Sequence, residues 1–224
     1  MNAVSPAEQS IAVTGTLEKI AEDILSELAQ QDLLREEALP LSRQMIRSAA
    51  LAIRATHRAQ FADAEEILAS AQQDLARLTE ITQSCPIFTA IGYVSAAQKE
   101  YAEACITYAL IRGEALPHPS ELQVPVAPYL NALGETAGEL RRSILDALRR
   151  DHLEPCEDWL QVMQQIYDFL TTVDYPDALT GGLRRTTDVL RRILESTRAD
   201  LTTAQRQHTL QVSLDRLQKQ LPRP

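Results

Sequence analysis

Apolar residues recur every three or four positions along most of the chain, which is the period of an amphipathic helix. The longest such pattern begins near Gly15 and ends near Ala59, and Pro40 inside it predicts a kink or break at about Leu39. Helix formers dominate every segment, so we predict an all-α, single-domain bundle of about seven helices with a very long first helix. The predicted helices are about 15–59, from 63, 86–113, 128–151, from 155 to a stop at 175–176, 183–199, and from 202 onward.

Two stretches fall outside the helical pattern. Residues 1–14 are small and polar, so we expect a flexible N-terminal arm before a helical domain over 15–224. Residues 113–128 contain four prolines and predict one long loop, which we interpret as a crossover inside one bundle. Near the C-terminus, Thr202 is a candidate N-cap for a last helix, whose apolar face would be formed by Leu210, Leu214, Leu217 and Leu221.

Composition narrows the class of protein. Aromatic residues make up 4% of the chain, and only 7 of 224 residues are glycine, which argues against a β fold. The formal net charge of −9 argues against a uniformly basic nucleic-acid-binding surface, although a local basic row remains compatible with it. The three cysteines are widely spaced and match no zinc pattern, so we expect reduced thiols. No stretch resembles a membrane span or signal peptide, and a cytoplasmic protein is expected.

Two pairs of glutamates are the first candidate for chemistry. Glu100 and Glu103 lie three residues apart, and Glu135 and Glu139 lie four apart, so each pair shares one helix face. Like charges repel there unless a cation lies between them, and carboxylate oxygens suit Mg²⁺ or Mn²⁺. We expect neighbouring antiparallel helices to bring the pairs into one four-carboxylate cluster. With 31 acidic residues in the chain, a solvated acidic face is the alternative, and the spacing alone favours it.

A row of arginines on the first helix is the second candidate. Arg43, Arg47, Arg54 and Arg58, called the arginine row below, project onto an arc about 60° wide at 100° per residue, with His57 beside them. Guanidinium groups arranged along a helix are suited to contact a phosphate backbone. The alternative is an exposed face that pairs with acids such as Glu36 and Glu37. A phosphate-binding row and a carboxylate cluster together suit metal-assisted cleavage of a phosphodiester.

These motifs resemble those of the translin family, in its translin-associated factor X branch. The segment from Gln98 to Ala104 is similar to that branch's QEYVEA signature, and the segment from Gly134 to Leu140 is similar to its A-D-L-T-G-E-L segment. Residues 41–43 and 57–58 also match, and the resemblance covers about residues 30–200. Glu100, Glu103 and Glu139 match glutamates of the family, whereas Glu135 takes the place of an aspartate and is one methylene longer.

The resemblance implies a subunit of a hollow homo-oligomer, an octamer being one expected size, that binds single-stranded RNA or DNA. It also implies a Mg²⁺-dependent endoribonuclease in which Glu100, Glu103, Glu135 and Glu139 hold the metal and position water. The arginine row and His57 would face the nucleic acid. Three alternatives remain open: a catalytically silent nucleic-acid-binding homologue, an all-α nucleotide pyrophosphohydrolase, and a protein whose long first helix is only a scaffold.

Overall fold

The computed structural model describes residues 6–85, 87–88 and 92–220, with side chains from residue 16 onward. Across these ranges the chain forms helices and no strand, which confirms the predicted all-α class. The predicted number of seven helices also holds, although their boundaries differ. They are α1 (Pro6–His57), α2 (Phe61–Ser84), α3 (Gly92–Arg112), α4 (Val126–Leu148), α5 (Glu154–Thr171), α6 (Asp177–Thr180) and α7 (Leu183–Gln220).

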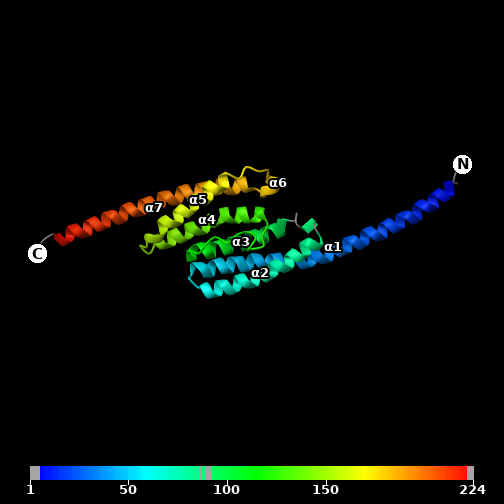
Figure 1. The fold of residues 1–224 in the computed structure, drawn as a ribbon, viewed down its shortest axis with the longest axis horizontal. Coiled ribbons are helices and arrows are strands. Elements are labelled where there is room, and N and C mark those ends of the chain that lie inside the picture. Colours follow the sequence, from blue (N-terminus) through cyan, green and yellow to red (C-terminus); the bar gives the residue numbers. More distant parts are fainter. Residues whose placement is uncertain (1–5, 86, 89–91, 221–224) are drawn as a thin grey trace.

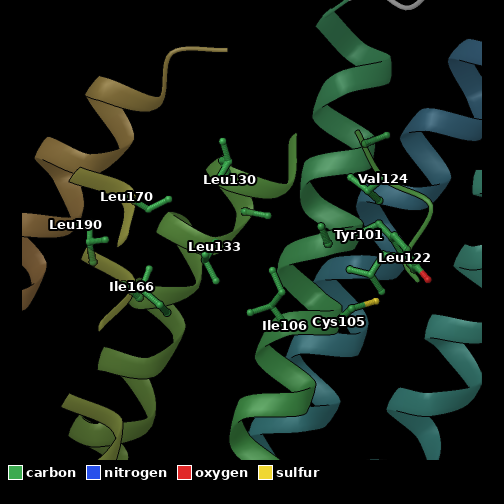
Figure 2. Close-up of a cluster of buried hydrophobic side chains, with 14 of the residues drawn as sticks. Tyr101, Cys105, Ile106, Leu122, Val124, Leu130, Leu133, Ile166, Leu170 and Leu190 are labelled. Atoms are coloured by element: carbon green, nitrogen blue, oxygen red, sulfur yellow. The ribbon is translucent and has the colours of Figure 1, made fainter. Parts of the chain in front are cut away.

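The helices are stacked side by side, with α3 and α4 in the middle of the body (Figure 1). The helices α1 and α2 pack on one side of α3, while α5 and α7 pack against α4 on the other side. Figure 2 shows how the core is filled between these helices, for example by Ile106 of α3, Leu133 of α4, Leu170 of α5 and Leu190 of α7. The apolar faces of the amphipathic helices are therefore buried mainly against the two outer sides of the α3–α4 pair.

The helix α1 is continuous over 52 residues, or about 78 Å at 1.5 Å per residue. It passes through Pro40 without a break, so of the predicted kink or break near Leu39 the break is wrong. Proline removes the hydrogen bond to the carbonyl of Glu36, but both residues are exposed, and water can satisfy that carbonyl. Residues 6–14 continue this helix rather than forming a separate arm. Residues 1–5 of the predicted arm lie outside the described residues.

Both long helices extend beyond the body. The N-terminal part of α1 and the C-terminal part of α7 project from opposite ends of the bundle (Figure 1). Apolar side chains are exposed on both projecting parts: Leu17 (63%), Ile20 (48%), Ile24 (51%) and Leu28 (55%) on α1, and Leu210 (61%), Leu214 (46%) and Leu217 (55%) on α7. Each set follows helical spacing. A single chain therefore leaves two apolar helix faces uncovered.

The end of the chain is one helix, not two. The predicted helix 183–199 and the predicted last helix are joined in α7, and Thr202 lies inside it, where its hydroxyl donates to the carbonyl of Arg198. The leucines predicted to face a core are the exposed ones on the projecting part, while Leu221 lies outside the described residues. Threonine is a common cap, but an uninterrupted helical pattern on both sides of it overrides that preference.

The helices α3 and α4 run parallel, contrary to the antiparallel arrangement expected from the sequence. The segment 113–125 crosses back along the bundle, so α4 begins beside the start of α3 (Figure 1). Leu122 and Val124 of this crossover are buried near Tyr101 of α3 (Figure 2). The hydroxyl of Tyr129 donates to the carbonyl of Pro117 at 2.8 Å. The crossover is thus part of the core, and it sets the register of the two helices that carry the glutamates.

The other differences concern boundaries. The helix α3 is described from Gly92, and Pro86, at which a helix was predicted to begin, lies outside the described residues; the short α6 was not predicted. Cys85, Cys105 and Cys156 are free thiols, as expected. Within the described residues, no helix combines the length and the apolar character needed to cross a membrane.

Gly134 allows α4 to approach α7 closely. A Cβ atom at this position would lie 2.6 Å from Thr186 Cγ2 and 3.2 Å from Leu170 Cδ1. The Thr186 side chain cannot easily turn away, because its hydroxyl donates to Asn131 Oδ1 at 2.6 Å.

We therefore expect Gly134→Ala to lower the free energy of unfolding by about 1–3 kcal/mol, as overpacking does in other cores. Gly138→Ala is the matched control on the same helix, because nothing lies within 4 Å of its added Cβ. The control should be neutral or stabilising by up to about 1 kcal/mol. Urea denaturation followed by circular dichroism measures both, and equal effects would contradict the close approach at Gly134.

Candidate metal centre and nucleic-acid surface

Three of the four predicted acids meet between α3 and α4. Glu100 and Glu103 come from α3 and Glu135 from α4, and one carboxylate oxygen of each lies within 4.8 Å of the others. We call these three residues the glutamate cluster. The i, i+3 spacing on α3 and the parallel register of α4 are sufficient to bring them together. Three oxygen donors on two rigid helices are a donor set suited to a hard divalent cation.

Glu103 is the buried member of the glutamate cluster, with 9% of its surface exposed. Burial, followed by the negative charges of Glu100, Glu135 and Glu139, raises the pKa of Glu103 to about 8, and the nearby Lys99 opposes this effect. A buried carboxylate with like charges around it lacks compensation for its own charge. The negative charge of the glutamate cluster is therefore not fully compensated by the surrounding side chains, and a bound metal ion would compensate it.

Lys99 supplies part of that charge. Its ammonium group lies 2.5 Å from Glu135 Oε2 and 3.4 Å from Glu100 Oε1. Burial lowers the pKa of Lys99, but the hydrogen bond and charge of Glu135, with those of Glu100, raise it above its usual value. The lysine stays charged and links the two half-exposed acids, while Glu103 receives no direct contact from it among the described interactions. No role was predicted for Lys99 from the sequence, although it adjoins Glu100.

Glu139, the fourth predicted acid, lies beside the cluster and has its own partners. His57 at the end of α1 donates from Nε2 to Glu139 Oε2 at 2.5 Å, and Arg142 Nη1 lies 3.6 Å from the same oxygen. The hydrogen bond from His57 is the main cause that lowers the pKa of Glu139, and it outweighs the opposing effect of burial. Ser143 Oγ lies 3.3 Å from His57 Nδ1. Glu139 is therefore an ionised acid held by a histidine rather than a member of the three-oxygen group.

The structure places His57 differently from the arginines with which it was grouped. Its side chain is only 5% exposed and is directed to Glu139, so it is not on the surface expected to face nucleic acid. This pairing joins residues 82 positions apart, and no sequence spacing signals it. The histidine instead connects the end of α1 to the acidic site.

The four members of the arginine row are exposed: Arg43, Arg47 and Arg54 lie on α1, opposite the side that packs on α2 and α3, and Arg58 directly follows the end of this helix. Arg54 donates to the carbonyl of Ala50, one turn earlier on the same helix. No ion pair forms between the arginine row and a carboxylate in the described part of the chain. Glu36 contacts Arg35, and Glu37 contacts Arg77, so the acids proposed as alternative partners are engaged elsewhere. The row is left free to bind an external anion.

Fold and site together define an all-α protein with an acidic centre inside the bundle and a row of exposed arginines along the C-terminal part of its longest helix and just after it. A comparison with family models finds no match. The chain is 31% identical over 196 residues to the uncharacterized protein MJ0175 of Methanocaldococcus jannaschii, covering 87% of each chain.

Solved structures give the same fold. The chain is similar to AfC3PO in its complex with duplex RNA (30% identity, TM-score 0.73) and to AfC3PO alone (29% identity, TM-score 0.76), covering 83% of this chain and 96% of each of those. The structure of apo-NeC3PO, at 20% identity and TM-score 0.75, covers 82% of this chain and 96% of its own, and supports the fold alone. The chain belongs to the translin family, as its motifs indicated. This assignment argues against the nucleotide pyrophosphohydrolase alternative.

Proposed function

We propose that this protein binds nucleic acid and cleaves single-stranded RNA with Mg²⁺ or Mn²⁺ as a homo-oligomer of the translin family. The observation that carries the proposal is the glutamate cluster, in which the carboxylates of Glu100 and Glu135 lie beside the buried, uncompensated Glu103. Duplex RNA in the related AfC3PO complex supports a nucleic-acid ligand. Single-stranded DNA is a second candidate ligand, because a contact to phosphates does not distinguish the two.

Glu100, Glu103 and Glu135 would hold the metal ion. When bound, such an ion lowers the pKa of a water molecule and stabilises negative charge on a phosphate. The chain itself supplies a neighbouring carboxylate, Glu139, which the hydrogen bond from His57 keeps ionised, so that it can orient a water molecule by accepting a hydrogen bond from it. Lys99 can release its contact with Glu135 when a cation satisfies the acids, and its ammonium can then contact a phosphate.

The arginine row would hold the strand outside the cluster. We expect the double variant Arg47→Ala/Arg54→Ala to weaken RNA binding and to reduce the slope of log K against log salt by about 0.7 for each lost phosphate contact. A filter-binding titration at several salt concentrations measures the slope. The matched control is Arg191→Ala/Arg192→Ala on α7, on the opposite side of the bundle (Figure 1), which removes the same charge. Equal effects of the two variants would exclude a specific role of the row.

Assembly would cover the projecting apolar faces. Leu17, Ile20, Ile24 and Leu28 form one exposed apolar row on α1, and Leu210, Leu214 and Leu217 form another on α7. Contiguous exposed apolar surface of this kind is typical of protein–protein contacts. The occupant that we propose is a second copy of the chain, and an octamer is one expected size.

One experiment tests the proposal as a whole. The purified protein is sized by light scattering and then incubated with labelled single-stranded RNA, with Mg²⁺, with Mn²⁺ or with EDTA. We expect a particle larger than one chain and internal cleavage that EDTA abolishes. A monomer would contradict the assembly, and intact RNA in all three conditions would contradict the nuclease.

The second candidate function is a nucleic-acid-binding homologue without catalysis. The position of Lys99 favours it, since an ammonium between Glu135 and Glu100 already provides positive charge in the place where a metal would act. In that case RNA is retained in a mobility-shift assay but stays uncut with either metal.

A further inference from the structure

An open cavity of about 630 Å³ lies next to the glutamate cluster, between the N-terminal halves of α3, α4 and α7. Lys99 and Glu135 line this cavity and also belong to the site described above. We propose that the cavity is a nucleotide-binding pocket, which receives the nucleoside that flanks the phosphate placed at the glutamate cluster. This inference rests on the proposed function, because the cluster defines which phosphate is bound.

The size and walls of the cavity suit a base. Its volume falls within the range of about 300–1,000 Å³ that is typical of small-molecule sites. Ala96 of α3, Pro128 of α4, and Val189 and Ile193 of α7 line it with small or apolar groups. Val189 is 38% exposed although it is apolar, so it presents contact area that the described part of the chain leaves uncovered. Apolar side chains of this kind can contact the face of any base.

The amide of Asn131, a polar group in the cavity lining, is satisfied within the chain. The amide nitrogen of Asn131 donates to the carbonyls of Ala127 at 2.9 Å and Thr180 at 2.8 Å, and its oxygen accepts from the hydroxyl of Thr186. Both donors of the Asn131 amide are therefore used. Asn131 therefore cannot donate to a base edge, and we expect the pocket to select nucleosides mainly by shape and with little base preference.

Positive charge at the cavity suits the phosphate on the other side of the nucleoside. Arg185 lines the cavity, is exposed, and forms no ion pair with any carboxylate in the described ranges. It lies in the first turn of α7, directly after Gly181 and Gly182, whose positive φ angles of 60° and 83° turn the chain into this helix. Arg185 can thus hold one phosphate while the glutamate cluster and Lys99 hold the next, with the nucleoside between them. This succession of an anion-binding group, an apolar cavity and a candidate metal site favours a nucleic-acid strand over a free metabolite as the ligand.

Photocrosslinking tests the pocket independently of cleavage. The full-length protein is incubated with single-stranded RNA that carries 4-thiouridine, with Ca²⁺ in place of Mg²⁺ so that a cation can occupy the glutamate cluster, irradiated, and mapped by mass spectrometry. We expect crosslinks on the cavity walls contributed by α3 and α7. We also expect Val189→Trp, which fills the cavity, and Arg185→Ala each to lower the crosslink yield at least about fivefold. The matched controls, Val126→Trp and Arg191→Ala, lie outside the cavity lining and should leave the yield unchanged.

Two further readouts keep the outcomes distinct. Circular dichroism verifies that Val189→Trp is folded, and Arg185→Ala tests the same pocket without adding bulk. Crosslinks that map elsewhere, or yields that the two pocket variants leave unchanged, would overturn the pocket while leaving metal-dependent cleavage by the wild type intact. Crosslinks at the cavity in a protein that never cleaves RNA would support the pocket and refute the nuclease. Similar yields for 4-thiouridine and 6-thioguanosine would support the weak base preference, whereas a tenfold difference would overturn it.

Discussion

Replacing Glu103 by glutamine is expected to lower the rate of Mg²⁺-dependent RNA cleavage by about 10²–10⁴-fold, the loss typical of a positioned acid–base or ligand group. Glutamine keeps the shape of the buried side chain but gives a cation no negative charge. Because the lost group belongs to the site itself, raising the Mg²⁺ concentration should not restore the rate. A gel assay with end-labelled RNA over a range of Mg²⁺ concentrations measures this loss.

Glu114→Gln is the control for this variant, since Glu114 is an exposed acid near the end of α3 that pairs only with Arg112 among the described contacts. The control should cleave RNA at the wild-type rate. Undiminished cleavage by Glu103→Gln would show that the reaction occurs outside the glutamate cluster. RNA binding in EDTA should be the same for both variants, which separates a loss of chemistry from a loss of affinity.

The same substitution is expected to stabilise the metal-free protein at alkaline pH. Burial and the neighbouring acids raise the pKa of Glu103 from 4.5 to about 8 on folding. Between these two values the folded protein binds more protons at this group than the unfolded chain, so its stability falls as the pH rises, by at most about 1.4 kcal/mol per pH unit. The stabilising contribution is complete below about pH 4.5 and lost above about pH 8. Glutamine does not ionise and removes this dependence.

We therefore expect Glu103→Gln to match the wild type near pH 4.5 and to exceed its free energy of unfolding at pH 9 by about 2–5 kcal/mol. Urea denaturation in EDTA at pH 4.5, 7 and 9 provides the measurement. Adding Mg²⁺ should stabilise the wild type by mass action and leave the variant unchanged. A difference between the two proteins that stays constant with pH would contradict the uncompensated charge of Glu103.

Much of the fold could be predicted because helical periodicity is a local property. The apolar positions of α2 and α5 face the core as their spacing indicated, for example Leu75 and Met163. The local signals failed where tertiary context decides. Pro40 stays inside α1 because the carbonyl of Glu36, which loses its hydrogen bond, faces solvent. The leucines of the projecting part of α7 are exposed because the described part of this chain supplies no surface to cover them.

For the candidate site, too, local features could be predicted from the sequence and tertiary contacts could not. Motif spacing identified the three acids of the glutamate cluster, but it could not reveal that α3 and α4 run parallel, since helix direction depends on the path of the crossover. The pairing of His57 with Glu139 depends on how the end of α1 meets α4, which no periodicity encodes. Arg185 and the cavity were not predicted, because their elements meet only after the chain has passed α6.

The length of the crossover between α3 and α4 limits how far α4 can shift along α3, and so fixes the positions of the acids in the glutamate cluster. Because Lys99 of α3 contacts Glu135 of α4, these two residues lie at the same height along the parallel helix axes. At 1.5 Å per helical residue, the chain must therefore run back about 33 Å along these axes between Arg112 and Val126. The connection provides about 14 peptide steps, which reach at most about 46–50 Å when extended. The spare length is only about four residues. Natural or engineered deletions longer than this would shift α4 along its axis and separate Glu135 from Glu103. The length of the crossover alone can therefore decide whether a relative keeps the glutamate cluster together.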